Sequence, residues 1–252
     1  VDKENFTKFM YAIHVGIDSL GKTLGRIDEE KFLLTAAFGA NKGQMDCIEY
    51  TKVAEFMDYI NMMTYDFNGT WSPDANHNSP LYSPEKGYEG SLDYAFKLLK
   101  ERGVPSYKIN LGVAFYGRSL KGFKGKEPQL YAEHDGKVDI ERYPLHEGMP
   151  LYYRIVDEMD GYDRQEWDDV VKNPYAISTK DSAFITYDNE KSIRMKAQYA
   201  FDNKCAGVII WDATGDYMEK KKGSLLISGT PLADQLVEVL QPCKQPRIQK
   251  RY

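Results

Sequence analysis

The alternation of side chains in residues 58–71, DYINMMTYDFNGTW, predicts a buried β-strand followed by a cluster of polar and aromatic groups. Positions 60, 62 and 64 and positions 61, 63 and 65 are both largely apolar, which is typical of strands in a parallel sheet covered by helices. The cluster contains Tyr65, Asp66, Asn68 and Trp71, with Gly69 as the turn. Parallel α/β barrels keep their active sites at the carboxyl ends of their strands. This segment therefore predicts a strand end that binds a sugar, because aromatic rings can lie against sugar faces.

Helices and strands alternate along the rest of the chain. Helical spacing predicts helices at residues 3–20, 49–57, 91–100, 188–204 and 231–240. Short apolar runs predict strands at 32–38, 108–116 and 206–211. Ser91 and Asp188 are expected to cap the helices that follow them, and Pro231 suits a first helical turn. This alternation indicates βαβ units and a parallel sheet.

Residues 119–182 interrupt the alternation with a segment rich in charge, Gly and Tyr, which predicts an α+β insertion subdomain. Trp167 lies there in an expected helical stretch and is interpreted as part of the insertion's own core. The expected division is a barrel part at 1–118, the insertion at 119–182, a second barrel part at 183–241 and a tail at 242–252. A complete eight-stranded barrel typically takes about 250 residues. Because only four barrel-type strands are found, the chain is predicted to form half of such a barrel.

Composition narrows the class of partner. The net charge of −5 argues against nucleic acid, which favours basic surfaces. No apolar run approaches the roughly 20 residues of a membrane-spanning helix, and no signal peptide is visible. The three cysteines show neither metal-type spacing nor a disulfide framework. The 19 tyrosines suit polysaccharide binding, although core packing is the better explanation for any single one.

Several segments, in order, resemble the catalytic domain of glycoside hydrolase family 18, the chitinases and their relatives. FLLTAAFGA resembles the fifth barrel strand, DYINMMTYDFNGTW the sixth and INLGVAFYGRSL the seventh. Residues 76–82, NHNSPLY, resemble the loop after the sixth strand, and residues 183–216 resemble the last helix and the eighth strand. The resemblance extends from about residue 2 to residue 240. It implies a TIM-barrel-type fold represented by strands five to eight, with an α+β insertion between strands seven and eight.

The family's D-x-x-D-x-D-x-E strand, whose Glu is the general acid, does not occur in these 252 residues. Residues 135–144, DGKVDIERYP, match this motif in part. On a strand, Asp139 and Glu141 would face the same way. Arg142 nevertheless takes the place of the acid, and the segment lies inside the insertion. A catalytic role for Asp139 and Glu141 is therefore not expected.

The resemblance implies a substrate-assisted mechanism, in which the acetamido oxygen of N-acetylglucosamine attacks the anomeric carbon. It makes Tyr65 and Asp66 catalytic: Tyr65 donates to the acetamido carbonyl and Asp66 contacts the neighbouring sugars. The implied substrate-binding residues are Met63, Trp71, Tyr116, Arg118 and Trp211. Each also has a structural explanation: local bonding for Tyr65, an ion pair with a loop carboxylate for Arg118, and packing for Met63 and the two tryptophans. Asp212 receives no role.

Three functions follow as hypotheses. The chain is the C-terminal portion of a chitinase that is inactive without its general acid, a chitin-binding lectin, or a fragment with neither activity. The expected partners are chitin or N-acetylglucosamine oligosaccharides, and self-association through open sheet edges is also expected. No metal and no cofactor is expected, because His77 and His134 lack partners at metal spacing and Gly-rich phosphate loops are absent. The resemblance implies a secreted or periplasmic protein.

Overall fold

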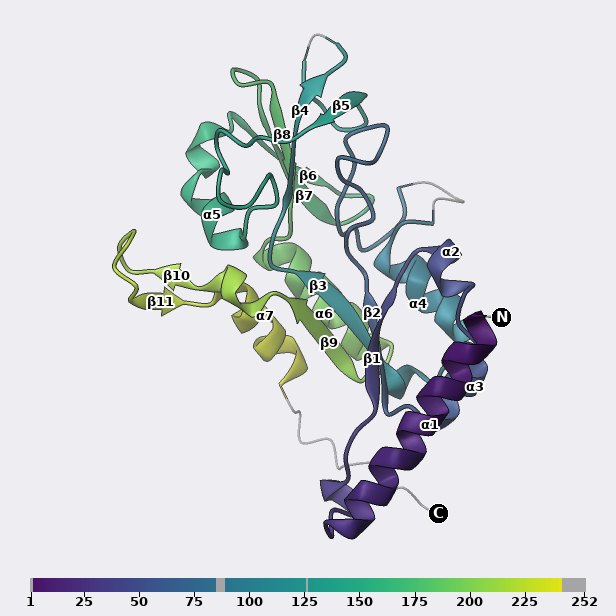
Figure 1. Cartoon of the computed structure of the whole chain (residues 1–252). Coiled ribbons are helices and arrows are strands. Elements are labelled where there is room, and N and C mark those ends of the chain that lie inside the picture. The colour runs from purple at the N-terminus through teal and green to yellow at the C-terminus, as the bar shows by residue number, and fades with distance from the viewer. Residues whose placement is uncertain (1, 85–88, 126, 242–252) are drawn as a thin grey trace.

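A four-stranded parallel sheet forms the centre of the computed structural model (Figure 1), which describes residues 2–84, 89–125 and 127–241. The tail predicted at 242–252 lies outside these residues. The strand order is β1-β2-β3-β9. The strands are β1 (Thr35–Gly39), β2 (Tyr59–Met63), β3 (Ile109–Ala114) and β9 (Gly207–Trp211). The four predicted strands are all present and pair in parallel, which confirms the α/β class.

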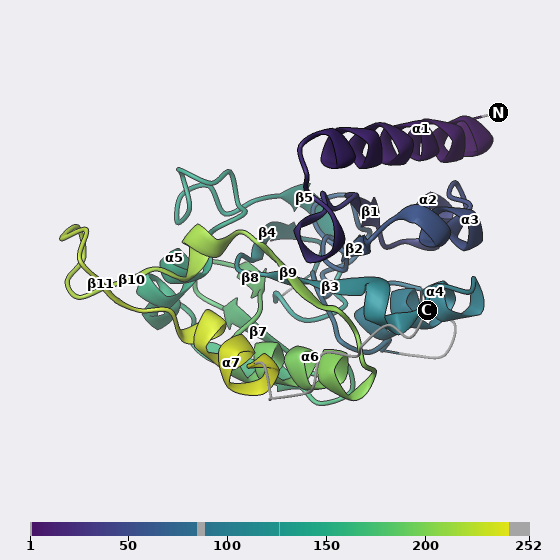
Figure 2. The same ribbon diagram turned by 90° about the horizontal axis from the view of Figure 1, so that it is seen from below.

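The longer helices form an arc around one face of this sheet, as Figure 2 shows. They are α1 (Asp2–Thr23), α3 (Tyr50–Phe56), α4 (Leu92–Glu101), α6 (Glu190–Asp202) and α7 (Pro231–Leu240). Burial follows this one-sided cover. Ile60 and Met62 of β2 are fully buried, whereas Asn61 and Met63 on the opposite face are only partly buried. The predicted parallel sheet is therefore covered by helices on the face of β2 that carries Ile60 and Met62, and the other face is only partly covered.

Local sequence accounts for most helix boundaries. The Ser91 side chain accepts the backbone N–H of Tyr94 at 3.2 Å, which confirms it as the N-cap of α4. The N-cap of α6 is Asn189, which forms a capping box, and not the predicted Asp188 one residue earlier. Asp188 instead points inward and forms an ion pair with Lys196.

The segment between β3 and β9 contains a second, antiparallel sheet in the order β5-β4-β8-β7-β6. Its elements are β4 (Arg118–Phe123), β5 (His134–Lys137), α5 (Tyr152–Asp157), β6 (Arg164–Asp168), β7 (Asn173–Ser178) and β8 (Ala183–Thr186). The expected α+β composition is present, and the sheet also includes β8, which lies beyond residue 182. Trp167 lies on strand β6, so the expected helix there is wrong. Its ring lies 3.7 Å from the Lys191 Nζ.

The remaining α-helix and the remaining strands are short. They are α2 (Lys42–Met45) after β1, and the hairpin of β10 (Met218–Glu219) and β11 (Ile227–Gly229) before α7. No helix in the described residues combines the length and apolarity needed to cross a membrane.

Candidate active site

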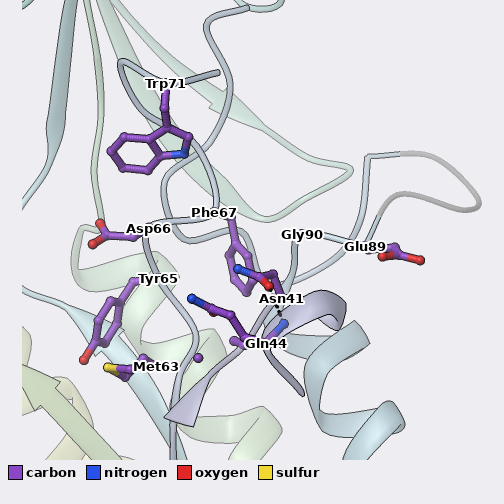
Figure 3. Close-up of a pocket in the computed structure, with 11 residues that line it drawn as sticks. Asn41, Gln44, Met63, Tyr65, Asp66, Phe67, Trp71, Glu89 and Gly90 are labelled. Carbon is purple, nitrogen blue, oxygen red and sulfur yellow. Dashed lines mark hydrogen bonds between the residues drawn. The ribbon is translucent and has the colours of Figure 1, made fainter. Parts of the chain in front are cut away.

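A pocket of about 440 Å³ lies at the carboxyl ends of β1 and β2 (Figure 3). Met63, Tyr65, Asp66 and Trp71 line it from β2 and the segment that follows. The segment after β1 and the segment before α4 contribute the other wall, with Asn41, Gln44, Glu89 and Gly90. In Figure 3, Asp66 lies between Trp71 on one side and Tyr65 with Met63 on the other. The pocket therefore brings together four of the seven site residues expected from the sequence.

Tyr65 offers a hydrogen-bond donor to this pocket. Its ring packs edge-on against Tyr116, with 6.1 Å between the ring centroids. No hydrogen bond to the Tyr65 hydroxyl is found within the described residues, and the side chain is half-buried. Burial, with the nearby charge of Asp66, raises the pKa of Tyr65 to about 12. The hydroxyl is therefore a protonated donor throughout the physiological pH range.

Asp66 is held by two residues that follow β3. Its Oδ1 accepts the Tyr116 hydroxyl at 2.5 Å and the Arg118 Nη2 and Nε at 2.7 Å and 3.1 Å. The Asp66 backbone has a φ of 60°, a left-handed conformation that is uncommon for non-glycine residues. Its backbone N–H donates to the Asn78 Oδ1 at 3.1 Å. Burial, reinforced by the Asp66 carboxylate, raises the pKa of Tyr116, so the phenol remains a donor to Asp66.

Arg118 also extends toward Trp71. Its guanidinium carbon lies 4.9 Å from the Trp71 ring centroid, within cation–π range, while its nitrogens bind Asp66. Trp71 is 57% exposed, so one part of the indole is held while much of its surface remains open to solvent. The ion pair expected as the structural role of Arg118 exists, and its carboxylate belongs to the same site.

Trp211 ends β9 beside Ala114 of β3 and does not line the pocket. Its indole is 56% exposed, which contradicts the alternative that it packs in the core. The peptide bond between Trp211 and Asp212 is cis. Asp212 accepts the backbone N–H of Thr214 at 2.9 Å and caps the short 3₁₀ turn that follows.

The structure separates Asp139 from Glu141. Both lie in a non-strand segment, so the expectation that they face the same way on a strand does not apply. Asp139 is buried, and the Glu141 side chain is 84% exposed. The Lys121 ammonium bridges them, at 3.3 Å from Asp139 and 3.0 Å from Glu141. Lys121 therefore forms one ion pair with the exposed Glu141 at the surface and a second with the buried Asp139.

Sequence reasoning missed the polar residues that reach the site from other segments. Asn41 caps α2 by accepting the Gln44 backbone N–H at 3.0 Å, and both side chains line the pocket. Asn78 belongs to the NHNSPLY segment, and its contact with Asp66 depends on how that segment folds back.

His77 is fully buried beside Asp168, with 3.1 Å between Nε2 and Oδ2. In the described residues, no three His, Cys, Asp or Glu side chains are grouped to hold a metal ion.

Comparisons with known proteins show the family that this chain resembles. The family model described as glycosyl hydrolases family 18 matches residues 1–216. Chitinase A1 of Niallia circulans is 32% identical over 244 residues, which are 91% of this chain and 34% of that protein. Chitotriosidase-1 of Mus musculus is 30% identical over 254 residues, which are 98% of this chain and 52% of that protein.

A solved structure described as "Human YKL-39 is a pseudo-chitinase with retained chitooligosaccharide binding properties" superposes with a TM-score of 0.80. It is 26% identical, and the match covers 95% of this chain and 66% of that one. The chain spans between 34% and about half of the length of the curated relatives it matches.

Proposed function

The chain belongs to glycosyl hydrolase family 18, and we propose that it forms the acetamido-positioning side of a chitinase-type cleft. The substrate class is β-1,4-linked N-acetylglucosamine polymer. The observation that carries this proposal is the Tyr65 hydroxyl, which lies in a pocket without a partner among the described residues. Beside it, Asp66 is held by Tyr116 and Arg118.

Tyr65 and Asp66 have the catalytic roles in this proposal. The substrate's acetamido oxygen attacks the anomeric carbon, and the bond to the leaving sugar oxygen breaks as an acid protonates that oxygen. The Tyr65 hydroxyl donates to the acetamido carbonyl and holds it near the reacting carbon, which lowers the entropic cost of the attack. The Asp66 Oδ2, which accepts no hydrogen bond from the described residues, faces the neighbouring sugar.

The remaining expected residues either bind the sugar chain or hold Asp66 in place. Trp71 and Trp211 offer exposed indole faces for stacking against pyranose rings. Met63 lines the pocket beside Tyr65, and Tyr116 and Arg118 fix the orientation of Asp66. Because Trp211 lies outside the 440 Å³ pocket, it would contact a sugar in the part of the cleft over β9.

The parallel sheet is assigned in this proposal to the second half of a TIM-barrel-type domain. Strands β1, β2, β3 and β9 take the places of the fifth to eighth barrel strands, and the antiparallel sheet is the insertion between the last two. The boundaries proposed from the sequence, 1–118, 119–182 and 183–241, divide these parts only approximately, because β4 begins at Arg118 and β8 (Ala183–Thr186) belongs to the antiparallel sheet. A secreted or periplasmic location, as the resemblance implies, fits a polymer that lies outside cells.

Chitin binding without hydrolysis is the second candidate. It is favoured by the similarity to YKL-39, whose structure is described as that of a pseudo-chitinase that retains chitooligosaccharide binding. Both candidates use the same pocket and predict the same ligand. They differ in whether an acid-bearing segment accompanies this chain.

Replacing Tyr65 with Phe is expected to weaken binding of N-acetylglucosamine tetramer by about two- to tenfold. The variant removes one hydroxyl donor, and a hydrogen bond contributes about 0.5–1.5 kcal/mol. Titration monitored by tryptophan fluorescence or calorimetry measures the Kd. Tyr107→Phe is the matched control, because Tyr107 is 62% exposed and precedes β3, away from the carboxyl ends of the strands. If Tyr65→Phe binds as tightly as the wild type, Tyr65 does not contact the acetamido group.

The isolated chain is expected to self-associate. Strands β1 and β9 end the parallel sheet, and neither has a second partner among the described strands. Unpaired strand edges promote association between chains. Light scattering across a dilution series should show dimers or larger species at micromolar concentration. A stable monomer at all concentrations would contradict this expectation.

A further inference from the structure

A buried ion pair joins helix α6 to the segment that follows β2. Lys196 is fully buried, and its Nζ lies 2.6 Å and 2.7 Å from the two carboxylate oxygens of Asp188. The same ammonium group donates to the backbone carbonyl of Ser79 at 2.5 Å and lies 2.9 Å from the Ser79 hydroxyl. The Ser192 hydroxyl donates to Asp188 at 2.6 Å. The ammonium group therefore joins residues 117 positions apart in the sequence.

Stability alone does not account for this pair. Taking two charges out of water is costly, and apolar residues of similar volume often do as well or better. Burial lowers the pKa of Lys196, while Asp188 favours its charged form. Unlike an apolar replacement, the ammonium group fixes the direction of several hydrogen bonds at once.

Those hydrogen bonds lead to the candidate active site. The Ser79 hydroxyl donates to the backbone carbonyl of Thr64 at 2.9 Å, and Thr64 directly precedes Tyr65. Asn78, which directly precedes Ser79, accepts the backbone N–H of Asp66 at 3.1 Å through its side chain. The Asn78 carbonyl also accepts the Phe67 backbone N–H at 3.0 Å. Fixing Ser79 therefore fixes the backbone on both sides of Tyr65 and Asp66.

We propose that Lys196 is a positioning residue for the oligosaccharide site, acting through Ser79 on the backbone that carries Tyr65 and Asp66. It does not touch the substrate. The ligand in this inference is the one named under the proposed function, whereas the effect on the backbone is independent of it. Without the ammonium group, residues 64–67 should sample several conformations, and the Tyr65 hydroxyl should spend less time in the binding orientation.

Two variants test the inference. In the double variant Lys196→Met/Asp188→Asn, both charges are removed together, so that no unpaired charge stays buried. Ser79→Ala retains the ion pair and removes only the hydroxyl that bridges Lys196 to Thr64. Leu99→Ala is the control, because it opens a cavity in a fully buried part of α4 and destabilises the fold without entering this network.

Two measurements are made on each chain under conditions where circular dichroism shows it fully folded. Deuterium uptake of a peptide covering residues 64–68 reports the backbone without ligand. Titration with N-acetylglucosamine tetramer reports the Kd. We expect the rate of deuterium uptake and the Kd each to rise by about tenfold or more in the double variant. Both should rise less in Ser79→Ala. Leu99→Ala should leave both close to the wild-type values.

The outcomes separate this inference from the proposed function. If uptake and Kd in both variants match those of Leu99→Ala, Lys196 has only a structural role and the inference is overturned. If the wild type does not bind the tetramer while the variants show faster uptake at residues 64–68, the positioning role stands and the proposed ligand is wrong. If Kd rises equally in all three variants, the effect follows stability, which also overturns the inference.

Discussion

Replacing Gly112 with Ala is expected to destabilise the chain by about 3 kcal/mol or more. A Cβ at this position in β3 would lie 2.7 Å from the Met62 carbonyl oxygen and 2.8 Å from the Thr64 nitrogen. Both are backbone atoms of the neighbouring segment, so no change of rotamer relieves the contact. Overpacking costs typically about 1–3 kcal/mol, and more where the backbone must move. Urea denaturation followed by circular dichroism measures the loss.

The same change should also weaken oligosaccharide binding. The third atom near the added methyl group is Cε1 of Tyr65, at 2.8 Å, so the ring must turn away from its position in the pocket. Gly16→Ala is the matched control, because no atom lies within 4 Å of a Cβ added in helix α1. It should stabilise the chain by about 0.5–1 kcal/mol, since Gly is unfavourable inside helices. Equal effects of the two substitutions would show that β2 and β3 do not approach as closely as described.

The parallel strands could be predicted because each is a mainly apolar run of five or six residues between helical segments. Ser91 and Pro231 acted as local signals, and the helices they begin are present. The prediction that Asp188 caps α6 is wrong. Local sequence does not reveal that this carboxylate is buried against Lys196, eight residues later. The helix predicted around Trp167 is wrong, because the charged stretch around this residue has no clear hydrophobic period.

The site was predictable where one segment supplies several groups. Tyr65, Asp66 and Trp71 come from a single strand end and line one pocket. The contacts of Arg118 with both Asp66 and Trp71 depend on the register of β2 and β3, which the sequence does not specify. The pocket wall formed by Asn41 and Gln44 was missed for the same reason, because polar residues after β1 resemble any helix cap until the strands are paired.

Incubating this chain alone with chitin oligomers is expected to release no measurable product. The proposed mechanism requires an acid to protonate the leaving oxygen, and the D-x-x-D-x-D-x-E motif that would supply it is absent from the 252 residues. Loss of a positioned general acid typically costs about 10²- to 10⁴-fold in rate. Chromatography of N-acetylglucosamine oligomers, with an intact family 18 chitinase as the positive control, measures the release.

Glu141 provides the sharpest test of that expectation. Its side chain is 84% exposed, lies 3.0 Å from the Lys121 ammonium group and does not line the pocket that contains Tyr65. Product release by the wild type that disappears in Glu141→Gln would make Glu141 the acid and overturn the proposed division of the site. Release that disappears only in Tyr65→Phe would mean that the pocket reacts without a protein acid. Binding without release from any variant would leave Tyr65 and Asp66 as the positioning half of a catalytic site.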